Sequence, residues 1–295
     1  SGPTPVVSQD KMSGDQAVDV CANCGTESSD AVKLKKCNAC HLVKYCSVGC
    51  QKAHRKQHKG ACKKRAAELK DEQLYGQGLE RPERDFCPIC TLPIPIPMED
   101  HSIFKVCCMK RVCRGCEVAA CKKGMFDCAF CRTPRHENDE SAVAMTQKRV
   151  DAKDPEALHF LGDQYYSGRC GLQENAARAI NLWKEAVELG SIDAHFNLGH
   201  VYLKGKGVAP DEAMAIQHWE SAAMKGHVEA RSNLGAIEYN KGNDERAVRH
   251  HLIAAKLGDK TSLDNIKDMF IEGVATKTQY TEALKGYQES VDEMK

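Results

Sequence analysis

The clearest pattern of apolar and polar positions lies in the second half of the chain, from Asp154 onward. One phrase recurs there with apolar and small residues three and four positions apart, as ALHFLGDQYYSG (157–168), AHFNLGHVYLKG (194–205) and ARSNLGAIEYNKG (230–242). This spacing places the apolar residues on one face of an α-helix. The Leu-Gly pairs at 161–162, 198–199 and 234–235 set the period at 37 and then 36 residues.

A second amphipathic phrase follows each copy of the first, as AINLWKEAVELG, AIQHWESAAMKG and AVRHHLIAAKLG. Its aromatic position holds Trp183 and Trp219, then His251, and Tyr287 in a degenerate fourth copy. One helical pair cannot bury its apolar face without a neighbour, so the pattern predicts an all-α solenoid of helical repeats. We expect it over 154–295, with repeats at about 155–191, 192–228, 229–259 and 260–294.

The first half of the chain lacks this periodicity and is rich in cysteine instead. Sixteen of the 17 cysteines lie between Cys21 and Cys131, in two blocks at 21–62 and 86–132. The polar start has no apolar core of a signal peptide. Closely paired cysteines in a chain without an export signal indicate metal ligands in a reducing compartment rather than disulfides. We therefore expect a cytoplasmic and/or nuclear protein.

The segments between these regions are polar and carry turn-forming residues. We expect disorder over 1–20, where Ser, Gly, Pro, Asp and Gln dominate. Residues 63–85 start with helix formers and end in Gly, Pro and charge, which predicts a short helix followed by a flexible linker. Residues 133–153 are expected to form a second linker. Nowhere do about 18 apolar residues run together, so we expect no transmembrane helix and no membrane partner.

The first block offers eight zinc ligands in four short-spaced pairs: Cys21 and Cys24, Cys37 and Cys40, Cys46 and Cys50, and His58 and Cys62. Zinc takes four thiolate or imidazole ligands tetrahedrally, so eight ligands make two closed sites without an open position for catalysis. So short a block with few large apolar side chains cannot fold on its core alone. Structural zinc contributes about 10–16 kcal/mol apparent in finger peptides and would supply the difference.

The order of these ligands resembles a MYND-type zinc finger, most clearly in YCSVGCQKAHRKQHKGAC. The resemblance implies two interleaved sites, one from Cys21, Cys24, Cys46 and Cys50 and the other from Cys37, Cys40, His58 and Cys62. His54 is an alternative to His58, which keeps the family spacing. The resemblance also implies a shallow groove for short proline-containing peptides. Arg55 stands where many members of the family have tryptophan.

The first block is also strongly basic, although the whole chain has a net charge of only +1. From Lys35 to Arg65 there are ten Lys or Arg and no Asp or Glu. Such a face suits an acidic protein or nucleic-acid phosphates, or it is a solvated surface that offsets the zinc-bound thiolates. No aromatic residues are interleaved to stack on bases, which disfavours nucleic acid. We favour the solvated surface.

The second block supplies eight sulfurs, from Cys87, Cys90, Cys107, Cys108, Cys113, Cys116, Cys128 and Cys131. It resembles a RING finger in FCPIC, VCRGC and CAFCR, and the resemblance implies that pairs one and three bind one zinc while pairs two and four bind the other. The Cys-x-His of the family falls on Cys108 and Lys110, and a lysine ammonium has no lone pair for zinc. Cys107 is therefore the expected fourth ligand, with His101 and Cys121 as alternatives.

Adjacent residues on an extended strand point to opposite faces, so Cys107 and Cys108 reach one metal only if the backbone turns between them. A hairpin between SIFKV and RVC, with CCMK at its tip, would provide that turn. Cys121 is expected on the helix that follows Cys116.

Two residues of this block match positions that RING-type ubiquitin ligases use. Ile89 matches the apolar contact for a ubiquitin-conjugating enzyme, and Arg132 matches the arginine that braces the donor ubiquitin. Ala129 stands where an active RING often has proline, and Ile89 can equally be a core residue.

The repeats resemble Sel-one-like repeats, relatives of the tetratricopeptide repeats, over about 155–294. No nucleophile arrangement stands out and nothing resembles a cofactor-binding domain, which disfavours a MYND-carrying methyltransferase. We predict a multidomain chain, with two small cross-braced zinc modules before the solenoid, that holds four structural Zn²⁺. Its predicted function is a zinc-binding protein–protein interaction scaffold whose partners are proteins or peptides. The alternative is a RING-type ubiquitin ligase that uses the solenoid as its substrate receptor and binds a ubiquitin-conjugating enzyme.

Overall fold

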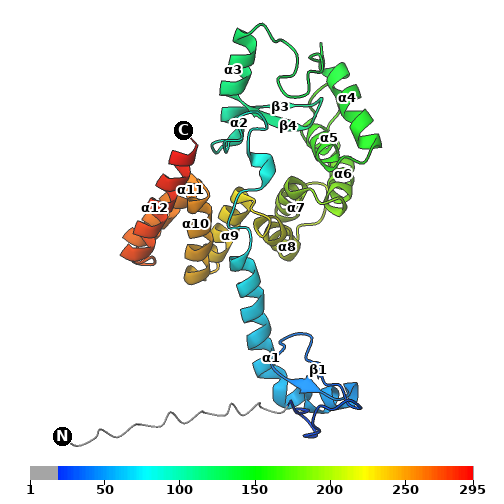
Figure 1. The fold of residues 1–295 in the computed structure, drawn as a ribbon, viewed down its shortest axis with the longest axis vertical. Helices are drawn as coiled ribbons and strands as arrows, with labels where there is room; N and C mark the ends of the chain where they lie inside the picture. The colour runs from blue at the N-terminus through cyan, green and yellow to red at the C-terminus, as the bar shows by residue number, and fades with distance from the viewer. Residues whose placement is uncertain (1–18, 295) are drawn as a thin grey trace, which may run out of the picture. The chain divides into compact units, whose positions relative to one another are not determined.

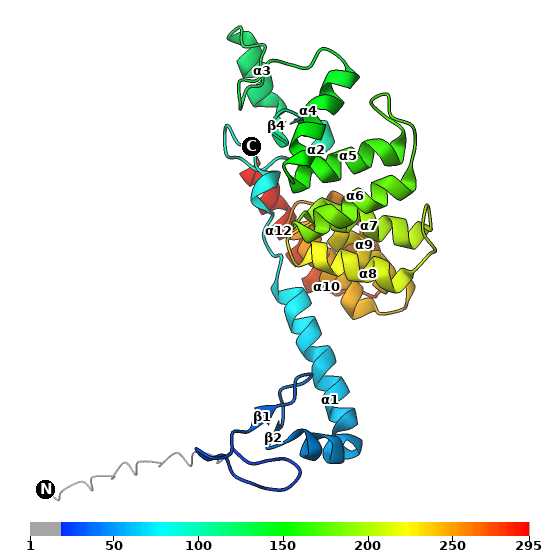
Figure 2. The same cartoon turned by 90° about the vertical axis from the view of Figure 1, so that its right-hand side faces the viewer.

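The computed structural model describes residues 19–294, so the disorder predicted for 1–20 lies almost entirely outside the described residues. The chain forms two compact units, one reaching to Glu72 and the other starting at Gln73. Within the described part, no helix is both long and apolar enough to cross a membrane. Figures 1 and 2 show the order of the elements along the chain.

The first unit has a core made mostly of thiols. Two short antiparallel strands, β1 (Lys35–Lys36) and β2 (Lys44–Tyr45), precede the long helix α1 (Val48–Gly76). The cysteines at 21, 37 and 40 and the ring of Tyr45 are almost fully buried, with Leu34 and Val43 packed against them. So few apolar groups leave the fold dependent on what binds the thiols.

Helix α1 is longer than the sequence predicts, because it does not end with the finger at residue 62. It continues without a break through the segment where we expect a separate short helix. Residues 63–75 contain neither proline nor glycine, and Arg65 pairs with Glu68 and Glu72 along the same face. These residues are strong helix formers that follow the finger helix directly, so the helix continues through them.

The cysteine-rich part of the second unit folds around a hairpin. It contains a 3₁₀ turn η1 (Glu83–Asp85), helix α2 (Met98–His101), strands β3 (Ser102–Lys105) and β4 (Lys110–Cys113), and helix α3 (Arg114–Lys122). The strands pair antiparallel from Ser102 with Cys113 to Lys105 with Lys110. Residues 106–109 form the turn, so the predicted hairpin with Cys107 and Cys108 at its tip is confirmed.

The linker predicted over 133–153 is mostly wrong, because helix α4 covers Asp139–Asp151. Asn138 caps this helix by accepting from the Ser141 N–H through its side-chain oxygen. The Asn138 backbone N–H in turn donates to the Ser141 hydroxyl oxygen. Ala142 and Thr146 are buried. The helix begins within the polar stretch TPRHENDE. Asn138 followed three residues later by Ser141 is itself a capping pattern.

The predicted all-α solenoid is confirmed by four consecutive helical pairs. These are α5 (Pro155–Ser167) with α6 (Ala176–Glu188), α7 (Ile192–Lys204) with α8 (Glu212–Ala223), α9 (Val228–Asn240) with α10 (Asp244–Lys256), and α11 (Lys260–Ile271) with α12 (Lys277–Glu293). Figure 2 shows the successive pairs stacked in layers. The side chain at the same position caps every first helix of a pair, through Asp154, Ser191, His227 and Asp259.

The repeated Leu-Gly phrase is explained by the aromatic residue of the second helix. Trp219 of α8 donates from Nε1 to the Phe196 carbonyl at 3.1 Å, and its ring lies against Gly199 of α7. A Cβ at Gly199 would come within 2.3 Å of Trp219 Nε1. Trp183 and Gly162 repeat this arrangement one unit earlier, with 2.5 Å for the same atom. Glycine is therefore required wherever the indole fills the seam.

We expect Gly199→Ala to destabilise the solenoid by about 2 kcal/mol. Overpacking costs about 1–3 kcal/mol and loss of the indole hydrogen bond about 1 kcal/mol, against a gain in helix propensity of up to about 1 kcal/mol. In a unit of this size the melting temperature should fall by about 4–8 °C, measured by circular dichroism.

Gly60→Ala is the matched control, because Gly60 is also inside a helix and a Cβ there meets nothing within 4 Å. This control should leave the melting of the solenoid unchanged. If Gly199→Ala melts like the wild type, the glycine has no packing role.

The segment of residues 77–85, which we call the strap, packs tightly against the solenoid, so the prediction of a flexible linker there is wrong. Gly78, at φ +62°, lies so close to α8 that a Cβ would be 2.0 Å from the Ala223 carbonyl oxygen. A Cβ at Gly226 would be 2.2 Å from the Glu80 oxygen. The composition of this segment predicts turns. The two glycines instead allow the backbone of the strap to lie close to the backbone of the solenoid.

Arg231 of α9 holds the start of the strap. Its guanidinium is fully buried and donates to the carbonyls of Leu74 and Gln77, both at 2.7 Å, and of Ala223 at 2.9 Å. Leu74 and Ala223 lie in the last turns of α1 and α8, where the carbonyls carry the negative end of each helix dipole. At the other end of the strap, Arg84 pairs with Asp193 and lies 3.7 Å from a Glu156 oxygen.

Candidate metal centres and binding groove

The first cluster of possible ligands gathers Cys21, Cys24, Cys46 and Cys50, whose sulfurs all lie within 4.8 Å of one another. Cys46 Sγ is 3.5 Å from the sulfurs of both Cys24 and Cys50. A tetrahedron with zinc–sulfur bonds of about 2.3 Å separates its corners by about 3.8 Å. The arrangement fits a zinc ion, while zinc ligation by these four residues stays a prediction.

The second cluster gathers Cys37, Cys40, His58 and Cys62 within the same limit of 4.8 Å. Cys37 and Cys62 sulfurs are 3.8 Å apart, and Cys40 Sγ lies 3.1 Å from His58 Nε2. His54, the alternative ligand, lies outside this group: its Nδ1 is 3.1 Å from the Tyr45 hydroxyl, and its ring stacks on His58. The geometry thus brings His58 rather than His54 to the thiols.

The second cysteine-rich block yields two further clusters. One joins Cys87, Cys90, Cys113 and Cys116, and the other joins Cys107, Cys108, Cys128 and Cys131. In the first of these, Cys90 and Cys113 sulfurs are 3.8 Å apart. Strand β4 ends at Cys113, whose sulfur caps α3 by accepting from the Cys116 N–H. A strand end and a helix start thereby place two thiols side by side.

In the fourth cluster the hairpin turn directs both adjacent cysteines to one point. Cys108 Sγ is 4.0 Å from Cys128 Sγ, and Cys131 Sγ is 3.4 Å from Cys107 Sγ. His101 is exposed at the end of α2 and lies outside the cluster. Cys121 lies on α3, as the sequence predicts, is half-buried, and has the Arg135 guanidinium 3.6 Å from its sulfur.

Four of the five C-x-x-C pairs share one local backbone turn, which the spacing alone does not reveal; the fifth, Cys113 with Cys116, lies at the start of α3. The carbonyl of the first cysteine accepts from the N–H four residues later, at 2.8 to 2.9 Å, and that later residue has a positive φ in every case, at Gly25, His41, Thr91 and Arg132. Glycine occupies the left-handed conformation in only one of the four turns. The turns hold each pair of sulfurs on one side of the backbone, as a shared metal requires.

Charge explains why these clusters need a cation. In the first cluster, hydrogen bonds from backbone N–H groups, that of Cys24 first, lower the pKa of Cys21 to about 6. Hydrogen bonding with the Cys24 sulfur raises the pKa of Cys46 to about 12. Thiols this close cannot all ionise together unless a positive charge lies between them. Bound Zn²⁺ supplies that charge and favours four thiolates.

One further group, Glu156, His159 and Asp193, also meets the distance limit of 4.8 Å. It differs from the cysteine clusters because Arg84 of the strap already places a cation against both carboxylates. This group is therefore an ion-pair network that anchors the strap to the first turns of α5 and α7.

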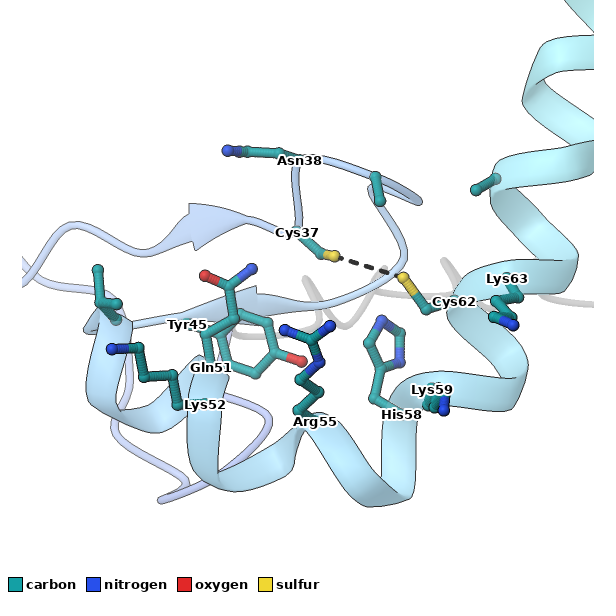
Figure 3. A pocket seen from close by; sticks show the side chains of 13 residues that line it. Cys37, Asn38, Tyr45, Gln51, Lys52, Arg55, His58, Lys59, Cys62 and Lys63 are labelled. Atoms are coloured by element: carbon teal, nitrogen blue, oxygen red, sulfur yellow. Dashed lines mark hydrogen bonds between the residues drawn. The ribbon is translucent and has the colours of Figure 1, made fainter. Parts of the chain in front are cut away.

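The first unit also contains a cavity of about 500 Å³ beside the second cluster. In the view of Figure 3 the Arg55 side chain is drawn between the ring of Tyr45 and His58, and Cys62 follows His58 along helix α1. Apolar atoms of Val48, Ala39 and Ala66 complete the lining. The cavity is an open groove between the cysteine loops and helix α1.

Four cations surround this groove: Lys52, Arg55, Lys59 and Lys63. Their spacing of three and four residues puts them on one face of α1. Among the described residues, none of the four forms an ion pair. The sequence shows a basic region, but only this spacing on a continuous helix indicates that its charges converge on one groove rather than spreading over a solvated surface.

Comparisons with known families agree with these features. Residues 21–62 match the MYND finger, and residues 155–191, 192–227 and 228–259 match the Sel1 repeat. The chain therefore contains a MYND finger and three Sel1 repeats, as the motifs predict. A fourth helical pair, α11 and α12, follows the matched repeats.

Two solved structures are similar to part of the chain. A protective antigen of uropathogenic Escherichia coli is 25% identical with a TM-score of 0.47, over 55% of this chain and 35% of that protein. A Sel1 repeat protein from Oxalobacter formigenes is 25% identical with a TM-score of 0.46, over 52% of this chain and 64% of that protein. In both cases the alignment spans less than two thirds of the other protein. No curated protein matches the chain.

Proposed function

We propose that this protein is a zinc-stabilised scaffold for protein–protein interaction with two separate peptide-binding surfaces. One observation carries the proposal: a single chain combines a MYND finger that has a lined groove with a solenoid of Sel1 repeats. Solenoids of this kind present extended surfaces to partner proteins. The finger groove and the solenoid would each hold one partner.

Zinc has a structural role in this proposal. Each cluster offers four protein ligands, which leaves no open coordination position for substrate. All 17 cysteines are free thiols in the structure. Thiols in such clusters stay reduced in the cytoplasm and the nucleus, which supports the proposed location in one or both compartments.

The finger groove suits a peptide with an apolar anchor and acidic neighbours. Its lining is apolar around Tyr45 and Val48, while Lys52, Arg55 and Lys59 surround it with positive charge. Arg55 occupies the position where the family commonly has tryptophan. A guanidinium at this position should bind a carboxylate in preference to a proline ring.

Selection from a displayed random-peptide library on the full, zinc-loaded chain tests the proposal. We expect two classes of enriched peptide. One class has acidic residues beside an apolar anchor and is lost in Arg55→Glu. The other class survives that substitution because it binds the solenoid.

Arg114→Glu is the control for Arg55→Glu, since Arg114 is exposed on α3 and does not line the groove. It should leave both classes enriched. Failure to enrich any peptide would contradict the scaffold proposal, and selection of nucleic acid by the Arg55 face in a parallel experiment would reassign that groove.

Ubiquitin-ligase activity stays a second candidate because of one observation. The Ile89 side chain is 42% exposed. It is therefore not a core residue, which was the alternative to a contact for a ubiquitin-conjugating enzyme. If the candidate is right, self-ubiquitination with a ubiquitin-conjugating enzyme should fall at least tenfold in Ile89→Ala and in Arg132→Ala. Absence of any transfer by the wild type would remove it.

A further inference from the structure

Two cavities on the solenoid are built from equivalent positions two repeats apart. The first, of about 350 Å³, lies between α5 and α7, and the second, of about 250 Å³, lies between α9 and α11. In both, a tyrosine of the first helix (Tyr166 or Tyr239) and an asparagine of the next first helix (Asn197 or Asn265) face the same space. The repeat therefore generates one kind of pocket along the row of first helices.

Asparagine fills the same position in three successive first helices, at Asn197, Asn233 and Asn265. Asn197 donates from Nδ2 to Asp163 at 2.6 Å, and Asn233 Nδ2 lies 3.4 Å from His200 Nε2. Among the described residues, the Oδ1 atoms of Asn197 and Asn233 have no hydrogen-bond partner, and neither end of the Asn265 amide has one. An amide carries the same donor and acceptor as a peptide group, so this row can bind an extended backbone.

The two pockets carry opposite charge. The first includes Arg169 and Lys204, and within the described chain neither forms an ion pair. The nearby cation Lys206, in contrast, already pairs with Glu174. The carboxylate of Asp163 in this pocket is held by the Asn197 amide and by Trp183 Nε1 at 3.1 Å. An incoming acidic side chain would therefore meet two uncompensated cations.

The second pocket has acidic side chains at the matching place. Glu272 occupies the repeat position of Lys204, and Asp268 occupies that of His200. Both are exposed, and Glu272 accepts a hydrogen bond from the Tyr239 hydroxyl. No lysine or arginine pairs with either carboxylate in the described residues. This end of the row is complementary to a basic side chain.

The strap shows that an extended chain can lie across these helices. It begins at Arg231 of α9 and ends where Arg84 meets Asp193 of α7 and Glu156 of α5. Figure 1 shows this cyan segment passing α9 on its way to the β3–β4 hairpin. It contacts the first turns of the helices, whereas the two pockets lie toward their last turns, so the strap leaves the row of pockets open.

We propose that this row of pockets binds an extended peptide of about nine residues that is acidic at one end and basic at the other. The acidic end lies over α5 and α7, and the basic end lies over α9 and α11. The strap uses nine residues, the last three of them in the η1 turn, to pass from α9 to α7 and α5. Nine fully extended residues span about 30 Å. This inference rests on the proposed scaffold function and names the partner class of its solenoid surface.

Two synthetic peptides of identical composition test the proposal on the full, zinc-loaded chain by fluorescence anisotropy. One is acetyl-EEATSTAKK-amide with a dye on an added terminal cysteine, and the other is acetyl-EKATSTAEK-amide labelled in the same way. We expect the bipolar peptide to bind at least tenfold more tightly. Lys204→Glu should weaken it at least tenfold, and Asn265→Ala about threefold.

Lys184→Glu serves as the matched control, because Lys184 is an exposed lysine of α6 that lines neither pocket. It should leave the affinity unchanged. Equal binding of the two peptides, or binding that Lys204→Glu does not alter, would overturn the inference. Either result leaves the scaffold proposal standing if the peptide library still yields a class that survives Arg55→Glu, so the two failures are distinguishable.

Discussion

Cys108→Ser should lower the zinc content of the chain from four ions to three, and Cys107→Ser should remove the same ion. The Cys108 sulfur faces Cys128 and the Cys107 sulfur faces Cys131 across one point at the tip of the hairpin. A serine hydroxyl does not replace a thiolate as a zinc ligand at neutral pH. A structural site contributes on the order of 10 kcal/mol, so the hairpin tip should lose protection in hydrogen exchange.

Cys121→Ser is the control for this pair. Cys121 lies on α3 with Arg135 beside its sulfur and does not belong to any of the four clusters. Native mass spectrometry of the three variants decides the matter. Loss of zinc in Cys121→Ser, or four retained ions in Cys107→Ser, would show that the ligand set is different.

The second large effect is expected at Arg231. Replacing it by methionine keeps most of the volume but removes the guanidinium donor from the carbonyls of Leu74 and Gln77 and leaves the Ala223 carbonyl with only the Gly226 N–H. Burial lowers the pKa of Arg231 to about 10, so the group remains charged at neutral pH, and among the described residues no carboxylate pairs with its guanidinium. We expect about 3 kcal/mol lower stability of the second unit in urea, because charged hydrogen bonds contribute about 1.5–3 kcal/mol each and removal of the charge offsets part of the loss.

Arg249→Met is the matched control, since the Arg249 guanidinium lies over the Tyr75 ring at 3.9 Å without being fully buried. Such a contact contributes about 1 kcal/mol or less. In Arg231→Met the strap should also become open to trypsin after Arg84, whereas the bond after Arg81 is protected from trypsin by the following Pro82 in every variant. Equal stability of the two variants, with the strap still protected, would mean that Arg231 does not hold it.

The parts of the fold that the sequence predicts correctly depend on local spacing. The solenoid follows from a period that repeats the pairing of Leu198-Gly199 with Trp219, and the hairpin tip follows from the need of Cys107 and Cys108 to turn together. The solenoid requires a filled seam between its helices, and the hairpin tip requires a shared metal. The residues that meet each requirement can be identified from their spacing in the sequence.

The strap is missed because it depends on contacts between distant residues, whereas α4 and the full length of α1 are missed for local reasons. The strap is read as flexible because Gly78 and Pro82 are turn formers, but Arg231, more than 140 residues away, fixes it. Helix α4 is missed because its cap at Asn138 lies in a polar run. The groove of the finger needs the continuity of α1, which puts Lys52, Arg55 and Lys59 on one face. None of these features has a signature in composition.

Elemental analysis of zinc in the purified, fully folded wild-type chain tests the central claim most directly, because the scaffold depends on two cysteine-rich modules that each hold two structural ions. The sixteen ligand atoms lie in four groups, each within 4.8 Å. The account predicts four zinc ions per chain. Two or fewer in fully folded material would contradict it, since one of the two modules would then fold without the metal that its thiol core requires.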